Sequence, residues 1–358
     1  KIDSSNIKNF SKYLSKCDLG DYNDYDELWD WSVNNIESFW SAFWDYSNVV
    51  GNKGEKVLTH FNNLMDAKFF PDGKINYAEN ILKTSNDGPA MIFHDEAGKR
   101  SEWSWEKVQN EVSLLQQSLV ETGVQSGDRV AGIVPNSPYT IIALLAVSSL
   151  GAVWSSCSPD FGLNAALDRI SQIGPKVLFC ADGYRYNGKE ISNMNVAADL
   201  TVAVPSIVQT IIFPLNNVSA DISIIGSKGI HWNDYIAPFS VQEVKYNRIN
   251  FNDPLFIMFS SGTTGLPKCI VHSAGGTILQ HLKEHQLQSD IKANDRLMYF
   301  TTCGWMMWNW MVSGLASGAT LVLFDGSPFY PDGNRLADIV SDEKVTHFGT
   351  SAKYLDAC

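Results

Sequence analysis

From residue 90 onward, short apolar runs alternate with amphipathic stretches. The runs at 90–94, 128–135 and 152–157 are short and bounded by polar or turn residues, which predicts buried strands. Between the runs, residues 105–123 and 164–173 carry apolar side chains at helical spacing. Strands that alternate with helices predict an α/β fold of layered, parallel-rich sheets with flanking helices. Further strands are expected at 176–180, 200–204, 210–214, 221–225, 255–259, 269–271, 295–302, 319–324 and 345–349, and further helices at 138–150, 275–285 and 334–342.

Several helix ends carry capping residues. Ser104 precedes the helix at 105–123 and Gly123 ends it, while Ser137-Pro138 places a cap and then a proline at the first helical position. Before this region, residues 20–50 carry Trp29, Trp31, Trp40 and Trp44 at helical spacing, with Asp24 or Asp26 as the cap. We expect this aromatic stripe to pack into a core. The predicted organisation is an N-terminal helical segment, 1–50, followed by one large domain over 51–358.

Composition limits the classes of partner. The chain has 358 residues, 44% hydrophobic and 18% charged, which is typical of a globular protein. Its 27 basic and 39 acidic residues give a net charge of −12, which argues against nucleic acid as the main partner. The longest apolar run, 141–147, is far shorter than the ~20 residues of a membrane span, and no signal peptide is visible.

Six cysteines are scattered along the chain without a Cys-x-x-Cys pair. This spacing does not indicate a zinc ribbon or a thioredoxin-like motif. Cys157, Cys180 and Cys269 lie in apolar stretches and are expected to be buried. The pattern suits a reducing compartment, and we expect the cytosol.

The segment 258–268, Met-Phe-Ser-Ser-Gly-Thr-Thr-Gly-Leu-Pro-Lys, carries the most chemistry. Its apolar start predicts a strand end, after which glycines allow backbone N–H groups to approach an anion. Hydroxyl groups and one lysine add donors and a positive charge, which together predict a polyphosphate site. The expected ligands of the phosphates are Ser260, Ser261, Gly262, Thr263, Thr264, Gly265 and Lys268. The segment is not a Walker A loop, since Gly265 is followed by Leu-Pro rather than Lys-Ser/Thr.

This segment resembles the phosphate loop of the adenylate-forming superfamily, which includes acyl-CoA synthetases, luciferases and peptide-synthetase adenylation domains. The resemblance implies attack of a carboxylate on ATP to make an acyl-adenylate, followed by transfer of the acyl group to a thiol. It gives Thr264 and Lys268 catalytic roles, and it implies ATP, CoA and Mg²⁺ as cofactors. The Trp-rich segment and Asn76-Tyr-Ala-Glu-Asn80 are similar to the N-terminal part of acetyl-CoA-synthetase-like enzymes.

A Trp- and Met-rich stretch, 303–311, follows the predicted strand at 295–302. It is either a buried helix or the wall of an acyl pocket. Gly304 and the density of large side chains favour the pocket, and the resemblance implies that this stretch lines the acyl and pantetheine channel. The candidate pocket residues are Trp305, Met306, Met307, Asn309 and His272; His272 has either a charge-related or a positioning role, and Asn309 is a candidate to bind a keto oxygen.

Two further motifs are open to more than one interpretation. Arg185 and Lys189 lie in a loop after the strand at 176–180, which is either a solvated turn or, by the resemblance, the site for the nucleotide phosphates of CoA. His281-Leu-Lys-Glu-His285 matches a zinc-protease pattern, but no third ligand is evident, so a structural histidine pair is favoured over zinc.

The segments at 154–162, 186–190, 269–276 and 304–312 are most similar to those of acyl-CoA synthetases that activate acetoacetate. The implied products are acetoacetyl-CoA, AMP and pyrophosphate. The adenine-binding motifs and the mobile C-terminal domain with its adenylation lysine are not found in the 358 residues, so we expect this chain alone to be inactive. The alternatives are an acetyl- or other short-chain acyl-CoA synthetase, or a non-catalytic nucleotide- or CoA-binding module. The oligomeric state is not predicted.

Overall fold

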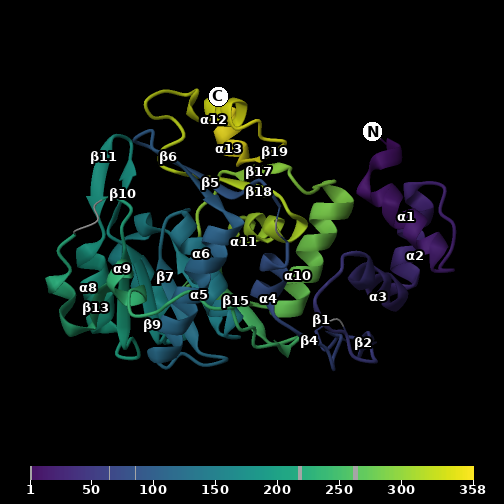
Figure 1. Ribbon diagram of the computed structural model, residues 1–358, viewed down its shortest axis with the longest axis horizontal. Helices are drawn as coiled ribbons and strands as arrows, with labels where there is room; N and C mark the ends of the chain where they lie inside the picture. Colours follow the sequence, from purple (N-terminus) through teal and green to yellow (C-terminus); the bar gives the residue numbers. More distant parts are fainter. Residues whose placement is uncertain (1, 64, 85, 217–219, 261–264) are drawn as a thin grey trace.

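The computed structural model describes residues 2–63, 65–84, 86–216, 220–260 and 265–358 (Figure 1). Within these residues, the larger sheet has seven strands. The strand order is β13-β12-β9-β7-β8-β15-β16, and neighbours run parallel except for the antiparallel pair β15 and β16. The strands are β7 (Arg129–Ile133), β8 (Val153–Cys157), β9 (Val177–Ala181), β12 (Gln209–Phe213), β13 (Gly229–His231), β15 (Pro254–Ser260) and β16 (Lys268–Ser273).

A second sheet has five strands in the order β19-β17-β18-β5-β6. It is parallel except for the pair β5 and β6. The strands are β5 (Pro89–Asp95), β6 (Arg100–Ser104), β17 (Arg296–Tyr299), β18 (Thr320–Asp325) and β19 (His347–Gly349). Smaller antiparallel sheets join β1 (Gly51–Asn52), β4 (Lys74–Ile75) and β14 (Ile249–Asn250), β2 (Leu58–Thr59) and β3 (Lys68–Phe69), and the hairpin β10 (Gly183–Tyr186) and β11 (Lys189–Ser192).

Helices cover both faces of the larger sheet. On β9, Val177 and Phe179 belong to a core shared with the five-stranded sheet, whereas Leu178 and Cys180 pack in a second core on the opposite face. This alternation is what burial on both faces requires. The helices of the large domain are α4 (Tyr77–Leu82), α5 (Trp105–Glu121), α6 (Pro138–Ser149), α7 (Gly162–Ile173), α8 (Met194–Ala203), α9 (Trp232–Ile236), α10 (Ala274–Lys283), α11 (Met306–Val312), α12 (Arg335–Asp342) and α13 (Ala352–Ala357). The predicted fold class is confirmed.

The N-terminal segment forms three helices, α1 (Asn6–Lys16), α2 (Tyr25–Asn34) and α3 (Ile36–Tyr46), drawn in purple at one end of the molecule (Figure 1). The Asp24 carboxylate accepts a hydrogen bond from the Glu27 amide, so the predicted cap at Asp24 is confirmed. Trp44 is buried in the main core, but Trp29 is 54% exposed, so only part of the aromatic stripe packs inward.

Three local predictions are wrong. Residues 200–204 largely belong to α8 rather than to a strand, because Met194, Ala197 and Leu200 form a buried helical face. Residues 221–225 overlap a 3₁₀ helix, Ser223–Lys228, rather than a strand. Short apolar runs do not distinguish helix from strand by periodicity alone. Cys269 is exposed, unlike Cys157 and Cys180, because β16 is an edge strand of the larger sheet. Among the described residues, no helix is long and apolar enough to cross a membrane.

Candidate active site

A cavity of about 480 Å³ lies where strands of both large sheets end. Asn136 follows β7 and Asp160 follows β8, both in the seven-stranded sheet. Thr302, Asp325 and Ser351 lie at or after the ends of β17, β18 and β19 in the five-stranded sheet. The carboxyl ends of parallel strands are where α/β folds bind ligands. This cavity is therefore the candidate active site.

The described ends of the predicted phosphate loop lie at the same edge of the larger sheet. β15 runs parallel to β8, so Ser260 at the end of β15 lies toward the edge that carries Asp160. β16 returns antiparallel, and Lys268 at its start pairs with Ser260. The predicted phosphate ligands Ser261, Gly262, Thr263 and Thr264 lie outside the described residues.

Lys268 and Gly265 have the exposure that a ligand-binding loop needs. Lys268 is exposed, and within the described part of the chain no carboxylate forms an ion pair with it. Gly265 has φ of +94°, a left-handed conformation that favours glycine. Gln172 of α7 donates a 3.0 Å hydrogen bond to the Pro267 carbonyl, which ties the end of the loop to the domain.

Two of the predicted pocket residues line the cavity. Trp305 and Met307 do so, and Trp305 is 65% exposed, which is far more than a core tryptophan would be. The preceding turn is held by the Ser156 hydroxyl, which donates a 2.7 Å hydrogen bond to the Cys303 carbonyl. Residues 306–312 form α11, whose buried side includes Trp308. The stretch is therefore both a helix and a cavity wall.

The other predicted pocket residues are not among those that line this cavity. Asn309 is buried, and its amide donates to the Met258 sulfur at 3.0 Å. Met306 is exposed, and His272 lies on β16 opposite Phe256. Burial lowers the pKa of His272, so its neutral form is favoured.

Arg185 and Lys189 lie in the hairpin β10–β11. Arg185 lines the cavity and forms an ion pair with Glu190 across the hairpin. Lys189 is paired with Tyr186, the neighbour of Arg185 along the strand. Because successive residues of a strand face opposite sides, Arg185 and Lys189 lie on opposite faces of the hairpin. The structure does not bring the two basic side chains together on one face.

His281 and His285 lie on the helical stretch after β16 and are buried. The His281 ring is 2.8 Å from the Ser313 hydroxyl, and burial lowers its pKa to about 3. The His285 ring lies against Trp310, with ring centroids 4.3 Å apart, and burial lowers its pKa as well. Within the described ranges, no group of three or more His, Cys, Asp or Glu side chains could hold a metal. These findings favour the structural histidine pair.

Asp325 contributes an unusual carboxyl group to the cavity wall. Burial raises its pKa to about 8. Three neighbouring carboxyl groups add to this effect: Asp95, Glu96 and Asp160. Near neutral pH the protonated, uncharged form of Asp325 is therefore favoured beside these acidic neighbours.

We expect Asp325→Asn to change how stability depends on pH. The pKa of Asp325 rises from 3.8 to about 8 on folding, so its favourable contribution is present below pH 3.8 and is lost as pH rises through about 8. The melting temperature of the variant should increase relative to wild type between pH 4 and pH 8. Thermal unfolding of both proteins across this pH range measures the difference in melting temperature. A difference that stays constant with pH, or that changes in the opposite direction, would contradict a raised pKa for Asp325.

The sequence prediction missed several cavity residues. Asn136, Ser158, Asp160, Asp325 and Ser351 all line the cavity. Each lies at or just after the carboxyl end of a predicted strand, and that shared position could have identified them. Asn136 also accepts a 3.0 Å hydrogen bond from Trp308 of α11, which links the end of β7 to the opposite wall.

The chain belongs to the AMP-binding enzyme family, whose match covers residues 78–358. Residues 25–81 match the N-terminal region of acetyl-coenzyme A synthetase. This assignment is consistent with a cavity and the described ends of the predicted phosphate loop at the carboxyl ends of the strands.

Individual relatives are more specific. The chain is 49% identical to acetoacetyl-coenzyme A synthetase of Rhizobium meliloti (strain 1021), covering 93% of this chain and 51% of that protein. It is 37% identical to malonamoyl-CoA synthetase of Penicillium aethiopicum, and the match covers 92% of this chain and 49% of that protein. The structure of acetoacetyl-CoA synthetase from Streptomyces lividans superposes with a TM-score of 0.93 at 37% identity, covering 100% of this chain and 55% of that one. The chain spans about half the length of the relatives it matches.

Proposed function

We propose that the protein containing this chain is an acid–thiol ligase that activates acetoacetate with ATP and transfers the acetoacetyl group to CoA. The carboxylate of the acid attacks the α-phosphorus of ATP and releases pyrophosphate. The CoA thiol then attacks the acyl carbon of the adenylate, forms the thioester and releases AMP. The single observation that carries the proposal is 49% identity over 336 residues to an acetoacetyl-coenzyme A synthetase, with the cavity and the phosphate-loop edge at matching ends of the strands.

In this reaction, Lys268 and the loop 260–268 would hold the ATP phosphates. Their support is the exposure of Lys268 at the sheet edge and the left-handed backbone of Gly265, which has φ of +94°. We propose that magnesium arrives with ATP, since this ion is held mainly by substrate phosphates and one or two carboxylates. Thr264 is proposed as a second catalytic residue of the loop on the motif alone.

The acyl and pantetheine parts of the substrates would occupy the 480 Å³ cavity against Trp305 and Met307. Arg185 at the same cavity would meet a CoA phosphate. Arg185 and Lys189 lie on opposite faces of the hairpin, so we assign the larger share of this interaction to Arg185. The large side chains of the wall favour a small acid.

Acid preference tests the proposal. We expect kcat/KM for acetoacetate to exceed that for acetate, butyrate and malonamate, measured as thioester formation by the full-length protein. A hydrophobic wall alone discriminates by only about 10–200-fold per methylene, whereas a polar group paired with the keto oxygen would add to this. Equal values for acetate and acetoacetate would favour an acetyl-CoA synthetase. A preference for malonamate would favour the activity named for the Penicillium aethiopicum relative.

We also propose that residues 1–358 alone do not complete the reaction, since the relatives are about twice as long. Thioester formation from acetoacetate by the 358-residue chain, in a preparation free of longer protein, would contradict this. Binding of ATP or CoA without turnover would fit a nucleotide-binding module formed by this half. A cytosolic location is proposed on the unpaired cysteines.

A further inference from the structure

Glu96 is a buried carboxylate that holds three backbone amides from two separate loops. It lies one residue after β5 and is 5% exposed. Its Oε2 accepts hydrogen bonds from the Asn187 amide at 2.8 Å and the Ser327 amide at 2.7 Å. Its Oε1 accepts one from the Gly188 amide at 2.7 Å. A carboxylate that accepts several N–H donors can stay charged when buried, and such bonds are stronger than neutral ones.

Two of these donors form the tip of the hairpin β10–β11. Asn187 has φ of +54° and Gly188 has φ of +77°, so the two-residue turn is of the type I′ class that suits tight hairpins. Gly188 also packs against the ring of Tyr330, because a Cβ there would meet that ring at 2.9 Å. The tip is therefore held by hydrogen bonds to Glu96 and by packing against Tyr330 in the loop after β18.

The same hairpin carries cavity residues. Tyr184, Arg185 and Tyr186 all line the cavity, and they lie in the strand that leads into this turn. The hairpin is a separate two-stranded sheet, so no strand pairing connects it to the seven-stranded sheet. Other contacts, including those at its tip, therefore hold it over the cavity. The hydrogen bonds of Glu96 are the charged contacts at the tip.

We infer that Glu96 is a positioning residue, which fixes the hairpin so that Arg185 faces the cavity and can bind a phosphate of the thiol substrate. The inference rests on the proposed function for the identity of that substrate. It goes beyond the phosphate loop and the acyl pocket, since Glu96 lies outside both and acts through Arg185. Gly326, with φ of +144°, belongs to this arrangement, because a Cβ there would meet the Glu96 side chain at 2.6 Å.

The test compares Glu96→Gln with the matched control Glu102→Gln in the full-length protein. Glu102 is an exposed carboxylate on neighbouring β6 and pairs only with Arg100 among the described residues. Glutamine keeps the size of Glu96 but places N–H groups against backbone N–H groups and removes the charge. Amide hydrogen exchange of residues 183–192 and 327 should accelerate by roughly ten-fold or more in Glu96→Gln, but not in the control.

The kinetic arm uses CoA and dephospho-CoA, which lacks the 3′-phosphate. For Glu96→Gln we expect KM for CoA to rise by roughly five- to ten-fold, while acetoacetate-dependent pyrophosphate exchange stays within about two-fold of wild type. The preference for CoA over dephospho-CoA should fall toward one. Gly188→Ala, which strains the same turn against Tyr330, should reproduce this pattern and decides the matter if Glu96→Gln does not fold.

Unchanged hydrogen exchange at the hairpin would overturn the inference, and so would faster exchange with no change in KM for CoA. Equal effects of the Glu96 and Glu102 variants would also overturn it, because they would indicate a general loss of stability. A wild-type protein that forms no thioester would instead refute the proposed function. The exchange comparison would still decide whether Glu96 holds the hairpin.

Discussion

Glu343→Ala should lower the free energy of unfolding by about 1.5–3 kcal/mol, the usual contribution of hydrogen bonds to a charged group, because Glu343 is buried while its partners Arg100 and Arg296 are part-exposed. Glu343 is 3% exposed and lies just after α12. Its carboxylate accepts two bonds from Arg100, at 2.6 and 3.1 Å, and lies 2.7 Å from the His94 ring. Arg296 donates to both its side chain and its carbonyl. Loss of this carboxylate leaves Arg100 on β6 and Arg296 on β17 without their shared partner.

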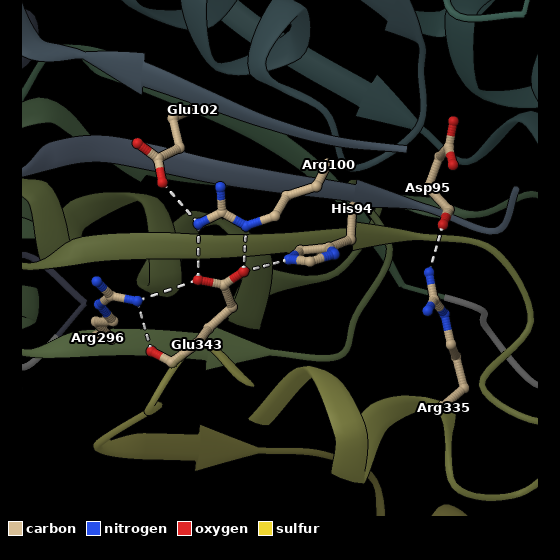
Figure 2. Close-up of polar contacts among 7 residues, drawn as sticks. All are labelled: His94, Asp95, Arg100, Glu102, Arg296, Arg335 and Glu343. Atoms are coloured by element: carbon tan, nitrogen blue, oxygen red, sulfur yellow. Dashed lines mark hydrogen bonds and ion pairs between the residues drawn. The ribbon is translucent and has the colours of Figure 1, made fainter. Parts of the chain in front are cut away.

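The control is Glu102→Ala, since Glu102 pairs with the same Arg100 (Figure 2) but is exposed to solvent. An exposed ion pair contributes about 0–1 kcal/mol, so the free energy of unfolding of this variant, measured by urea denaturation, should be close to that of the wild type.

Hydrogen bonding to Arg100 is the main cause that lowers the pKa of Glu343 below 4.5. The stability that Glu343 provides is therefore present above pH 4.5 and lost as pH falls, so the gap between wild type and variant should narrow in acid. Equal losses for the two variants would contradict the assignment of Glu343 as the centre of the cluster.

Lys268→Ala should slow acetoacetate-dependent pyrophosphate exchange at least ten-fold, which corresponds to about 1.4 kcal/mol of transition-state stabilisation. Removal of one preorganised donor costs about 100–1,000-fold in favourable cases. Lys268 begins β16 at the loop edge, is exposed, and has no carboxylate partner in the described ranges, so its charge is available to a developing negative charge. We expect kcat to fall more than the affinity for ATP.

The matched control for Lys268→Ala is Lys292→Ala. Lys292 is an exposed lysine that forms an ion pair with Asp290 and lies in a different loop. Its replacement should leave pyrophosphate exchange within about two-fold of wild type. If Lys268→Ala exchanges pyrophosphate at the wild-type rate, the loop at 260–268 does not hold the reacting phosphates.

Much of the α/β fold could be predicted because buried strands of this chain are bounded by clear turn residues. Gly174, with φ of +53°, ends α7 where the sequence predicts a stop, and Ser104 caps α5 through the Lys107 amide. The pattern failed where a short apolar run fits a helix and a strand equally well. Residues 200–204 read as a strand because Leu200, Val202 and Val204 alternate, yet Val202 is exposed on the outer face of α8.

The site was predicted only in part because a cavity combines strands that are distant in sequence. The motif at 258–268 could be identified from local chemistry alone, and its described ends lie at the expected sheet edge. Asp325 carries no local signature, since its raised pKa depends first on burial in the folded chain and then on carboxyl groups from two other parts of the chain, Asp95-Glu96 and Asp160. Arg185 and Lys189 lie four positions apart, but only the hairpin register reveals that they face opposite ways. The sequence pattern alone therefore does not reveal strand register or burial by distant parts of the chain.

The most direct test of the central claim follows oxygen from the acid into the nucleotide. The full-length protein is incubated with ATP, CoA and acetoacetate labelled with ¹⁸O in its carboxylate, and the products are analysed by mass spectrometry. Attack of the carboxylate on the α-phosphorus predicts one ¹⁸O atom in AMP and none in pyrophosphate. Label in inorganic phosphate, with ADP as the other product, would contradict an acyl-adenylate, and unlabelled AMP would show that the acid is not the group that attacks ATP.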